Sequence, residues 1–318
     1  METNIFKSSL RNRLFDFINF KQFQGYHYKV EINRIRRFDD FLIKKDYSCD
    51  VLTQEIIDDY TSSFAAICNN SKLSRFSIIK EFSIYLKMFE ANSYLIYKNA
   101  FRQMPIKKSY IFTAEEIKSL LKYFKTNIKS DSLLSVTNYT ISGILAFTGM
   151  RISECLNLNI KDWDEKNKLL FIKQGKFGKD RLIPLSDSVN IKLQKLMLIR
   201  RKHNAIENIE QLFINNKFKR VTYFAFNYHF KKFLNEYQIN ENKQWSRKPT
   251  IHSLRHTFAV NNILKFIKRE ENINNILPYL STYMRHISLS STQVYLQSVK
   301  EMKKIGADKF HKIFKKNI

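Results

Sequence analysis

Three short patterns in the second half of the chain contain side chains that could act on a phosphate group. The first is TGMRISE at 148–154, where Gly149 is a natural helix terminator and Arg151 would sit in the first turn of the next helix. Arg151 and Glu154 would then be neighbours on one helical face, three residues apart. Taken alone, this pair is best interpreted as a surface ion pair.

The second pattern is HSLRH at 252–256, in which His252 and Arg255 again lie three residues apart on one helical face. Such a pair could address one phosphoryl group, because the imidazole can move a proton while the guanidinium binds two oxygens. The alternative is a histidine that caps a helix beside a solvated arginine.

The third pattern is His286 followed nine residues later by Tyr295, in RHISLSSTQVYL. A tyrosine hydroxyl can act as a nucleophile if a base assists it and cations stabilise the group that it attacks. The chain has 16 tyrosines and 7 histidines, so this pair alone indicates little.

Taken together and in this order, the patterns resemble the catalytic domain of the tyrosine recombinases, the phage integrase family. A fourth match joins them, a predicted hairpin with a lysine. The matched segments are TGMRISE at 148–154, GKFGKDRLIPL at 175–185, HSLRH at 252–256 and RHISLSSTQVY at 285–295. Several specified side chains in one order and at fitting separations are hard to obtain by chance. The resemblance covers about 111–298, and for 1–110 it is only architectural.

The resemblance implies how a scissile phosphate would be held. Arg151 and Arg255 match the two arginines that clamp its non-bridging oxygens. His286 takes the position, histidine or tryptophan in the family, that hydrogen-bonds the phosphate. Glu154 matches an acidic position that supports the site without taking part in the chemistry.

The resemblance also implies a covalent mechanism. Tyr295 matches the nucleophile, which would form a 3′-phosphotyrosyl link with DNA. His252 matches the histidine that assists proton transfer at this nucleophile, and Lys176 matches the hairpin lysine that protonates the leaving 5′ oxygen. Lys173 and Lys179 remain alternatives to Lys176.

Two positions depart from the family pattern. Phe177 stands where a second glycine often follows the hairpin lysine, and this is why the choice of lysine stays open. Arg285 stands where the family most often has glycine before the histidine. Arg285 either adds a contact to a phosphate or is merely solvated.

No cofactor and no metal ion are expected. The six glycines form neither G-x-G-x-x-G nor G-x-x-x-x-G-K-[ST], so a standard dinucleotide or P-loop site is improbable. The chain also lacks H-E-x-x-H and any carboxylate cluster of the kind that holds Mg²⁺. Prearranged arginine, lysine and histidine donors would instead stabilise the charge of a phosphodiester transition state.

Few turn-forming residues occur, with only 6 glycines and 4 prolines, and this favours long helices over a many-stranded barrel or sandwich. The predicted fold is mainly α with a small β-hairpin or sheet: a helical core-binding domain and a mixed α/β tyrosine-recombinase catalytic domain. Apolar periodicity predicts helices in the second half of the chain at 188–204, 222–237, 252–266, 272–284 and 290–297. Two short apolar runs predict the strands of the hairpin, at 168–173 and 181–185.

Four segments follow from these observations. Residues 1–104 would be a helical, SAM-like DNA-binding domain, and 105–112 a linker around Pro105. A capping box at Thr113 and Glu116 opens the catalytic domain, 113–300. The lysine-rich residues 301–318 would form an amphipathic tail that packs on its own domain or docks on a neighbouring protomer.

A net charge of +26 favours a polyanionic partner, and residues 109–318 hold 37 basic and 17 acidic side chains. The expected partners are double-stranded DNA with core recombination sites, a homo-tetramer on two such sites, and in some cases an accessory DNA-bending protein. The start has no apolar segment typical of a signal peptide, and the longest uncharged run resembles a buried helix more than a membrane span. No membrane partner and a cytoplasmic location are therefore predicted.

The leading functional prediction is a site-specific DNA recombinase that integrates, excises or resolves a mobile element or replicon. A type IB topoisomerase or telomere resolvase would use the same chemistry. A catalytically idle DNA-binding accessory protein on the same fold is the alternative from another class, although all six expected catalytic positions are filled.

Overall fold

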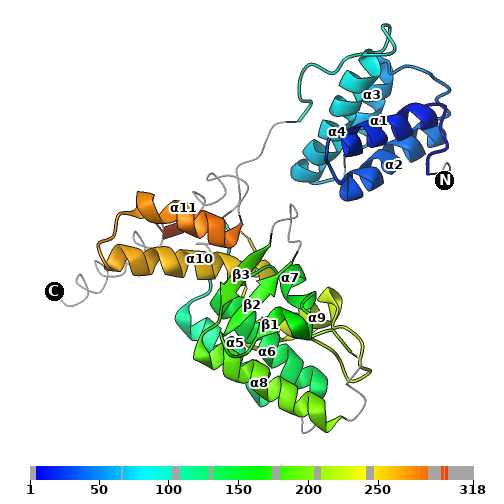
Figure 1. The fold of residues 1–318 in the computed structure, drawn as a ribbon. Coiled ribbons are helices and arrows are strands. Elements are labelled where there is room, and N and C mark those ends of the chain that lie inside the picture. Colours follow the sequence, from blue (N-terminus) through cyan, green and yellow to red (C-terminus); the bar gives the residue numbers. More distant parts are fainter. Residues whose placement is uncertain are drawn as a thin grey trace. The chain divides into compact units, whose positions relative to one another are not determined.

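The structure is a computed structural model, and it describes residues 5–65, 67–101, 108–128, 132–173, 180–203, 209–240, 247–285, 295–296 and 298–299. The chain forms two compact units, Met1–Ile106 and Lys107–Ile318 (Figure 1). Each unit has its own hydrophobic core, and the two are described separately.

The first unit is a bundle of four helices, α1 (Arg11–Phe23), α2 (Lys29–Lys44), α3 (Gln54–Ser62) and α4 (Asn69–Lys87). Its core combines aromatic with aliphatic side chains, and Phe17, Phe38 and Phe82 in it are fully buried. The carboxylate of Asp39, buried on α2, accepts hydrogen bonds from the backbone N–H groups of Lys7 and Ser8 at 2.8 and 3.0 Å. The segment before α1 is thereby fixed to the bundle.

The second unit contains seven α-helices among its described residues and a short 3₁₀ helix, Ile160–Asp162. The helices are α5 (Ala114–Thr126), α6 (Leu133–Thr148), α7 (Ile152–Leu156), α8 (Asp187–Lys202), α9 (Tyr223–Glu236), α10 (Ile251–Lys268) and α11 (Ile273–Met284). The last four confirm predicted helices to within a few residues. Most of the predicted helix 290–297 lies outside the described residues. Within that range only 295 and 296 are described, and both are helical.

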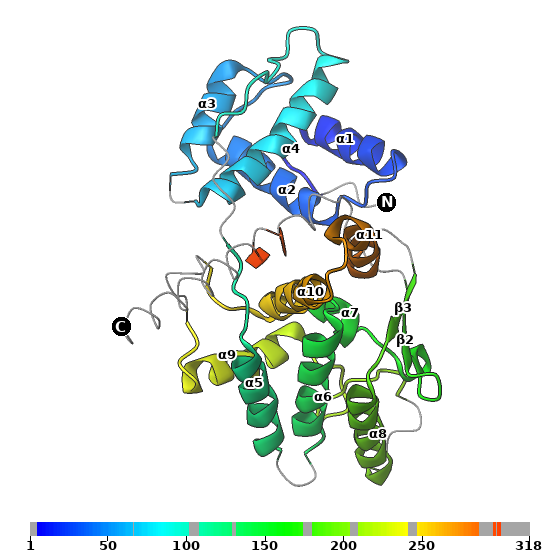
Figure 2. The same ribbon diagram turned by 90° about the vertical axis from the view of Figure 1, so that its left-hand side faces the viewer.

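Helix α6 is the centre of the second unit, where it packs against α5, α8 and α10 (Figure 2). It comes from the longest uncharged run of the chain, and most of its side chains are buried. The predicted capping box opens α5, since Thr113 accepts from the N–H of Glu116 and Glu116 accepts from that of Thr113. Gly149 ends α6 in the left-handed conformation, with φ of 61°.

A three-stranded antiparallel sheet lies beside these helices, in the order β1 (Trp163–Asp164), β2 (Leu169–Ile172) and β3 (Arg181–Pro184). Strands β2 and β3 form the predicted hairpin, and Leu170 pairs with Ile183 at its fully buried centre. The two-residue strand β1 was not predicted. The expected fold class, mainly helical with a small sheet, is confirmed. No helix among the described residues is both long and apolar enough to span a membrane.

Candidate active site

Glu154 is the buried acid around which two arginines gather. Its side chain is 6% exposed, and its carboxylate accepts the backbone N–H and the Nη1 group of Arg151 at 2.9 and 2.8 Å. Arg151 is the N-cap residue of α7, so this pair also closes the first turn of that helix. Arg181, the first residue of β3, donates from Nη2 to the same carboxylate at 2.7 Å. The exposed ion pair that Arg151 and Glu154 suggest in isolation is therefore wrong.

Glu154 stays ionised in this environment. Burial alone raises the pKa of its carboxyl group, but the Arg181 charge, the N–H of Arg151 and the Arg151 guanidinium outweigh that effect and hold the pKa below its usual value. The carboxylate therefore keeps its negative charge at neutral pH and orients both arginines.

Three successive carbonyl groups at the end of α11 accept hydrogen bonds from three arginines of three different elements. Arg181 Nη1 donates to the carbonyl of residue 283 at 3.0 Å, and Arg151 Nη2 donates to that of Arg285 at 3.0 Å. Arg255 Nη2, from α10, donates to the carbonyl of Met284 between them. The last carbonyls of a helix lack intrahelical partners and carry partial negative charge, so they are suitable acceptors for cations.

Arg255 is the more deeply buried of the two proposed phosphate-clamping arginines, with 3% of its surface exposed. Its Nη1 also donates to the carbonyl of Gly149 at 2.7 Å. Burial, aided by the charge of Arg151, lowers the pKa of Arg255 to about 10. The group remains protonated at neutral pH, so the site keeps both positive charges.

His252 lies one helical turn before Arg255 and next to the same cations. Desolvation and the charges of Arg255, Arg151 and Arg247 lower the pKa of His252 to about 4. The imidazole is therefore uncharged at neutral pH, so it can accept a proton. The ring of His256, one turn further on, meets it edge-on at a centroid distance of 4.7 Å.

Tyr295 is 97% buried in this structure, since only 3% of its surface is exposed. Burial raises the pKa of its hydroxyl, against the charges of Arg255 and Arg151 and a hydrogen bond from Arg255. The hydroxyl is thus protonated at neutral pH and needs a base before it can attack. The ring centroid of His256 lies 5.5 Å from that of Tyr295 and 4.7 Å from that of His252.

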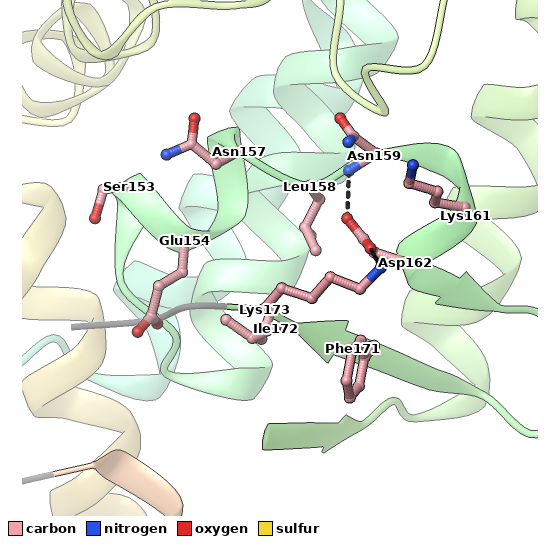
Figure 3. Close-up of a pocket in the computed structure, with 10 residues that line it drawn as sticks. All are labelled: Ser153, Glu154, Asn157, Leu158, Asn159, Lys161, Asp162, Phe171, Ile172 and Lys173. Carbon is pink, nitrogen blue, oxygen red and sulfur yellow. Dashed lines mark hydrogen bonds and ion pairs between the residues drawn. The ribbon is translucent and has the colours of Figure 1, made fainter. Parts of the chain in front are cut away.

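Two of the predicted site residues, Lys176 and His286, lie outside the described residues, and so does Lys179. Lys173 is described. Its Nζ lies 3.5 Å from Oδ1 of Asp162, and Figure 3 shows its side chain extending toward that carboxylate. Both residues line a pocket of about 270 Å³ that also includes Glu154, whose carboxylate points away from Asp162 in Figure 3.

The structure places Arg151, Glu154, Arg255, His252 and Tyr295 close enough together for each to influence the pKa of another or to have its own pKa influenced. Arg181 and His256 lie next to these residues, and no role for either was predicted from the sequence. Both lie inside quoted motifs, GKFGKDRLIPL and HSLRH, and an arginine at the start of a predicted strand was a signal for the first. Among the described residues, no three His, Cys, Asp or Glu side chains gather so as to hold a metal ion.

Comparisons with known proteins identify the family of this chain. The model of the phage integrase family matches residues 111–302. A putative integrase/recombinase, y4rE of Sinorhizobium fredii, is 24% identical over 294 residues, which are 92% of this chain and 93% of the relative. Tyrosine recombinase XerC of Listeria welshimeri is 24% identical over 257 residues, 78% of this chain and 77% of the relative.

Two solved structures share the fold. The XerH site-specific recombinase bound to its difH substrate has a TM-score of 0.61 at 20% identity, over 85% of this chain and 75% of its own. The integrase of transposon Tn1549 in complex with transposon right end DNA has a TM-score of 0.62 at 18% identity, over 89% and 94%. Because the family model spans more than half of the sequence, the chain belongs to the phage integrase family, the tyrosine-type site-specific DNA recombinases that cleave and rejoin DNA strands.

Proposed function

We propose that Tyr295 is the nucleophile of this recombinase. Its hydroxyl oxygen attacks the scissile phosphorus and gives its proton to the neutral imidazole of His252. The bond from phosphorus to the 5′ oxygen breaks, and Lys176 protonates that oxygen. A 3′-phosphotyrosyl link and a free 5′ hydroxyl result, and attack by the 5′ hydroxyl of a second strand reverses the steps and rejoins the DNA.

Arg151 and Arg255 would bind the non-bridging oxygens of the phosphate, with His286 as a further donor. The single observation that carries the proposal is the environment of Tyr295, which receives a hydrogen bond from Arg255 and the electrostatic influence of Arg151. A phosphate next to this hydroxyl would meet both guanidinium groups. Because these donors are fixed beforehand, they stabilise the charge that develops in the transition state.

Double-stranded DNA with core recombination sites is the proposed substrate, and a net charge of +26 supports it. Residues 1–104 would form the core-binding domain, joined by 105–112 to a catalytic domain at 113–300. The exposed side chains of Arg36 and Arg37 on α2 would contribute phosphate contacts. The reaction would take place in the cytoplasm and would serve to integrate, excise or resolve a mobile element or replicon.

Tyr295→Phe tests the nucleophile, with Tyr279→Phe as the matched control. Tyr279 lies on α11 in the same unit and is 76% exposed. On a nicked suicide substrate, the natural protein and Tyr279→Phe should form a covalent protein–DNA adduct. Tyr295→Phe should bind the same DNA with similar affinity and form none. An adduct with Tyr295→Phe would refute the assignment.

A homo-tetramer on two DNA sites is the proposed assembly, with residues 301–318 docking on a neighbouring protomer and an accessory DNA-bending protein assisting at some sites. Residues 301–318 hold six lysines and an apolar set at helical spacing. Deletion of 302–318 should leave single-site binding nearly intact and impair synapsis and recombination, measured by gel shift and a two-site assay. Normal synaptic complexes formed by the truncated protein would contradict the docking of residues 301–318 on a neighbouring protomer.

A further inference from the structure

Arg285 ends α11 in a backbone conformation that glycine adopts more easily. Its φ is 50°, in the left-handed region, and its N–H bonds to the carbonyl of Thr282 at 3.0 Å. A side chain at such a position is strained, because its Cβ crowds the neighbouring carbonyl oxygen. The turn itself thus gives no reason for arginine.

The two Nη atoms of Arg285 are held away from solvent, with no acceptor among the described residues. Both atoms are buried, and neither makes a hydrogen bond to the part of the chain that the structure describes. Buried polar groups are nearly always hydrogen-bonded, and an unpaired buried charge is costly. The interpretation of Arg285 as a merely solvated side chain, which the sequence left open, is therefore wrong.

Positive charge exceeds negative charge around this group. The Arg285 guanidinium is close enough to Arg181 to affect its ionisation, and Arg181 is in turn affected by Arg151. Glu154 is the acid of this cluster, and its oxygens already accept from Arg151 and Arg181. The buried donors of Arg285 consequently belong to a cluster of arginines whose shared carboxylate, Glu154, is already engaged by two of them.

We propose that Arg285 binds a phosphate oxygen of the DNA backbone at the active site, beside Arg151 and Arg255. This inference rests on the proposed function, because it needs DNA to place a phosphate there. The backbone of Arg285 is already fixed, since its carbonyl accepts from Arg151 Nη2. The phosphate is either the scissile one or its immediate neighbour, and the two have the same chemistry.

The experiment measures equilibrium binding of duplex DNA against salt concentration, in a Tyr295→Phe background that prevents cleavage. Arg285→Gly removes the guanidinium and suits the left-handed backbone, and Arg285→Lys keeps the charge without the planar fork. Arg285→Gly should bind several-fold more weakly, with a salt slope lower by about 1. Arg269→Gln, at an exposed position after α10, is the control and should leave the slope unchanged.

Neutral methylphosphonate at single backbone positions then locates the contact. The binding defect of Arg285→Gly should disappear only when the phosphate that Arg285 contacts is neutral. Disappearance at the scissile position or at its neighbour supports the proposal and distinguishes the two sources. Thermal unfolding should show that Arg285→Gly is at least as stable as its parent, so a folding defect cannot explain weaker binding.

An unchanged salt slope, or a defect that persists on every neutralised duplex, would overturn the role of Arg285. Failure of the proposed function has a different signature. In that case the natural protein would form no covalent adduct on the suicide substrate, whatever residue stands at 285.

Discussion

Arg181 Nη2 lies 2.7 Å from Glu154 Oε2, although 27 residues separate them in the chain. Both side chains are nearly buried, at 10% and 6% exposed. Arg181 begins β3, and Glu154 orients Arg151 from the first turn of α7. This contact therefore links the hairpin that carries the proposed general acid to a guanidinium of the proposed phosphate clamp.

Arg181→Ala should lower stability by about 3 kcal/mol, because it leaves Glu154 with one of its two cations missing in a buried site. The single-turnover cleavage rate should fall by more than DNA affinity does, since Arg151 loses its orientation. Denaturant unfolding and cleavage of the suicide substrate measure the two effects. Lys168→Ala breaks an exposed ion pair with Asp187 and should cost less than about 0.5 kcal/mol.

A double-mutant cycle of Arg181→Ala with Glu154→Gln should give a coupling free energy of about 1–3 kcal/mol. Strict additivity of the two changes would mean that the pair does not act as a unit.

The proton-accepting role of His252 predicts an unusual titration. Its pKa is lowered to about 4, so the free protein should show a His252 ring signal that titrates far below the ordinary 6.5. Because a base works only in its neutral form, cleavage should persist as pH falls to about 5 and decline below that. NMR titration and a pH–rate profile test this, and an ordinary midpoint near 6.5 would refute it.

Gly149→Ala should be strongly destabilising. A Cβ there would lie 2.4 Å from Cδ1 of Phe258, and φ is 61°, so clash and backbone strain together should cost about 3 kcal/mol. The Gly149 carbonyl also accepts from Arg255, so cleavage should fall as well. Gly25→Ala, at φ of 87° with nothing within 4 Å, isolates the strain and should cost about 1 kcal/mol.

Lys176→Ala should cleave ordinary DNA slowly and recover on a substrate with a 5′-bridging phosphorothiolate, whose thiolate leaves without a proton. Single-turnover cleavage of both substrates is the measurement. Lys173→Ala, which removes the partner of Asp162, should show no such selective rescue. Equal defects of Lys176→Ala on both substrates would move the role to Lys173 or Lys179, or to none of them.

Local patterns predicted local structure well. Helical periodicity gave α8 to α11, and the glycine at 149 ended α6 as expected. The spacing of Arg151 and Glu154 predicted their contact, although Arg151 lies at the N-cap and not in the first turn. A two-residue strand such as β1 leaves no periodic signal and was missed.

Long-range relationships were beyond the sequence. Nothing local indicates that Arg181 meets Glu154, or that Arg151 reaches a carbonyl 134 residues further along the chain. The motif resemblance supplied the roles of His252 and Tyr295. That the His256 ring lies near both of them could be seen only in the three-dimensional structure. Whether the Arg285 guanidinium is buried or solvated likewise depends on which groups pack around it in the fold, and the sequence does not show these groups.

The row of carbonyls at residues 283–285 has a consequence for the nascent chain. Arg151 leaves the ribosome 134 residues before the carbonyl that it bonds, and Arg181 leaves 102 residues before its own. At roughly 5–20 residues per second, this delay is on the order of 10 s. During translation the two arginines can already meet Glu154, but the carbonyl groups at the end of α11 are not yet present. The complete arrangement, and with it the ability to cut DNA, therefore arises only when synthesis has passed the end of α11.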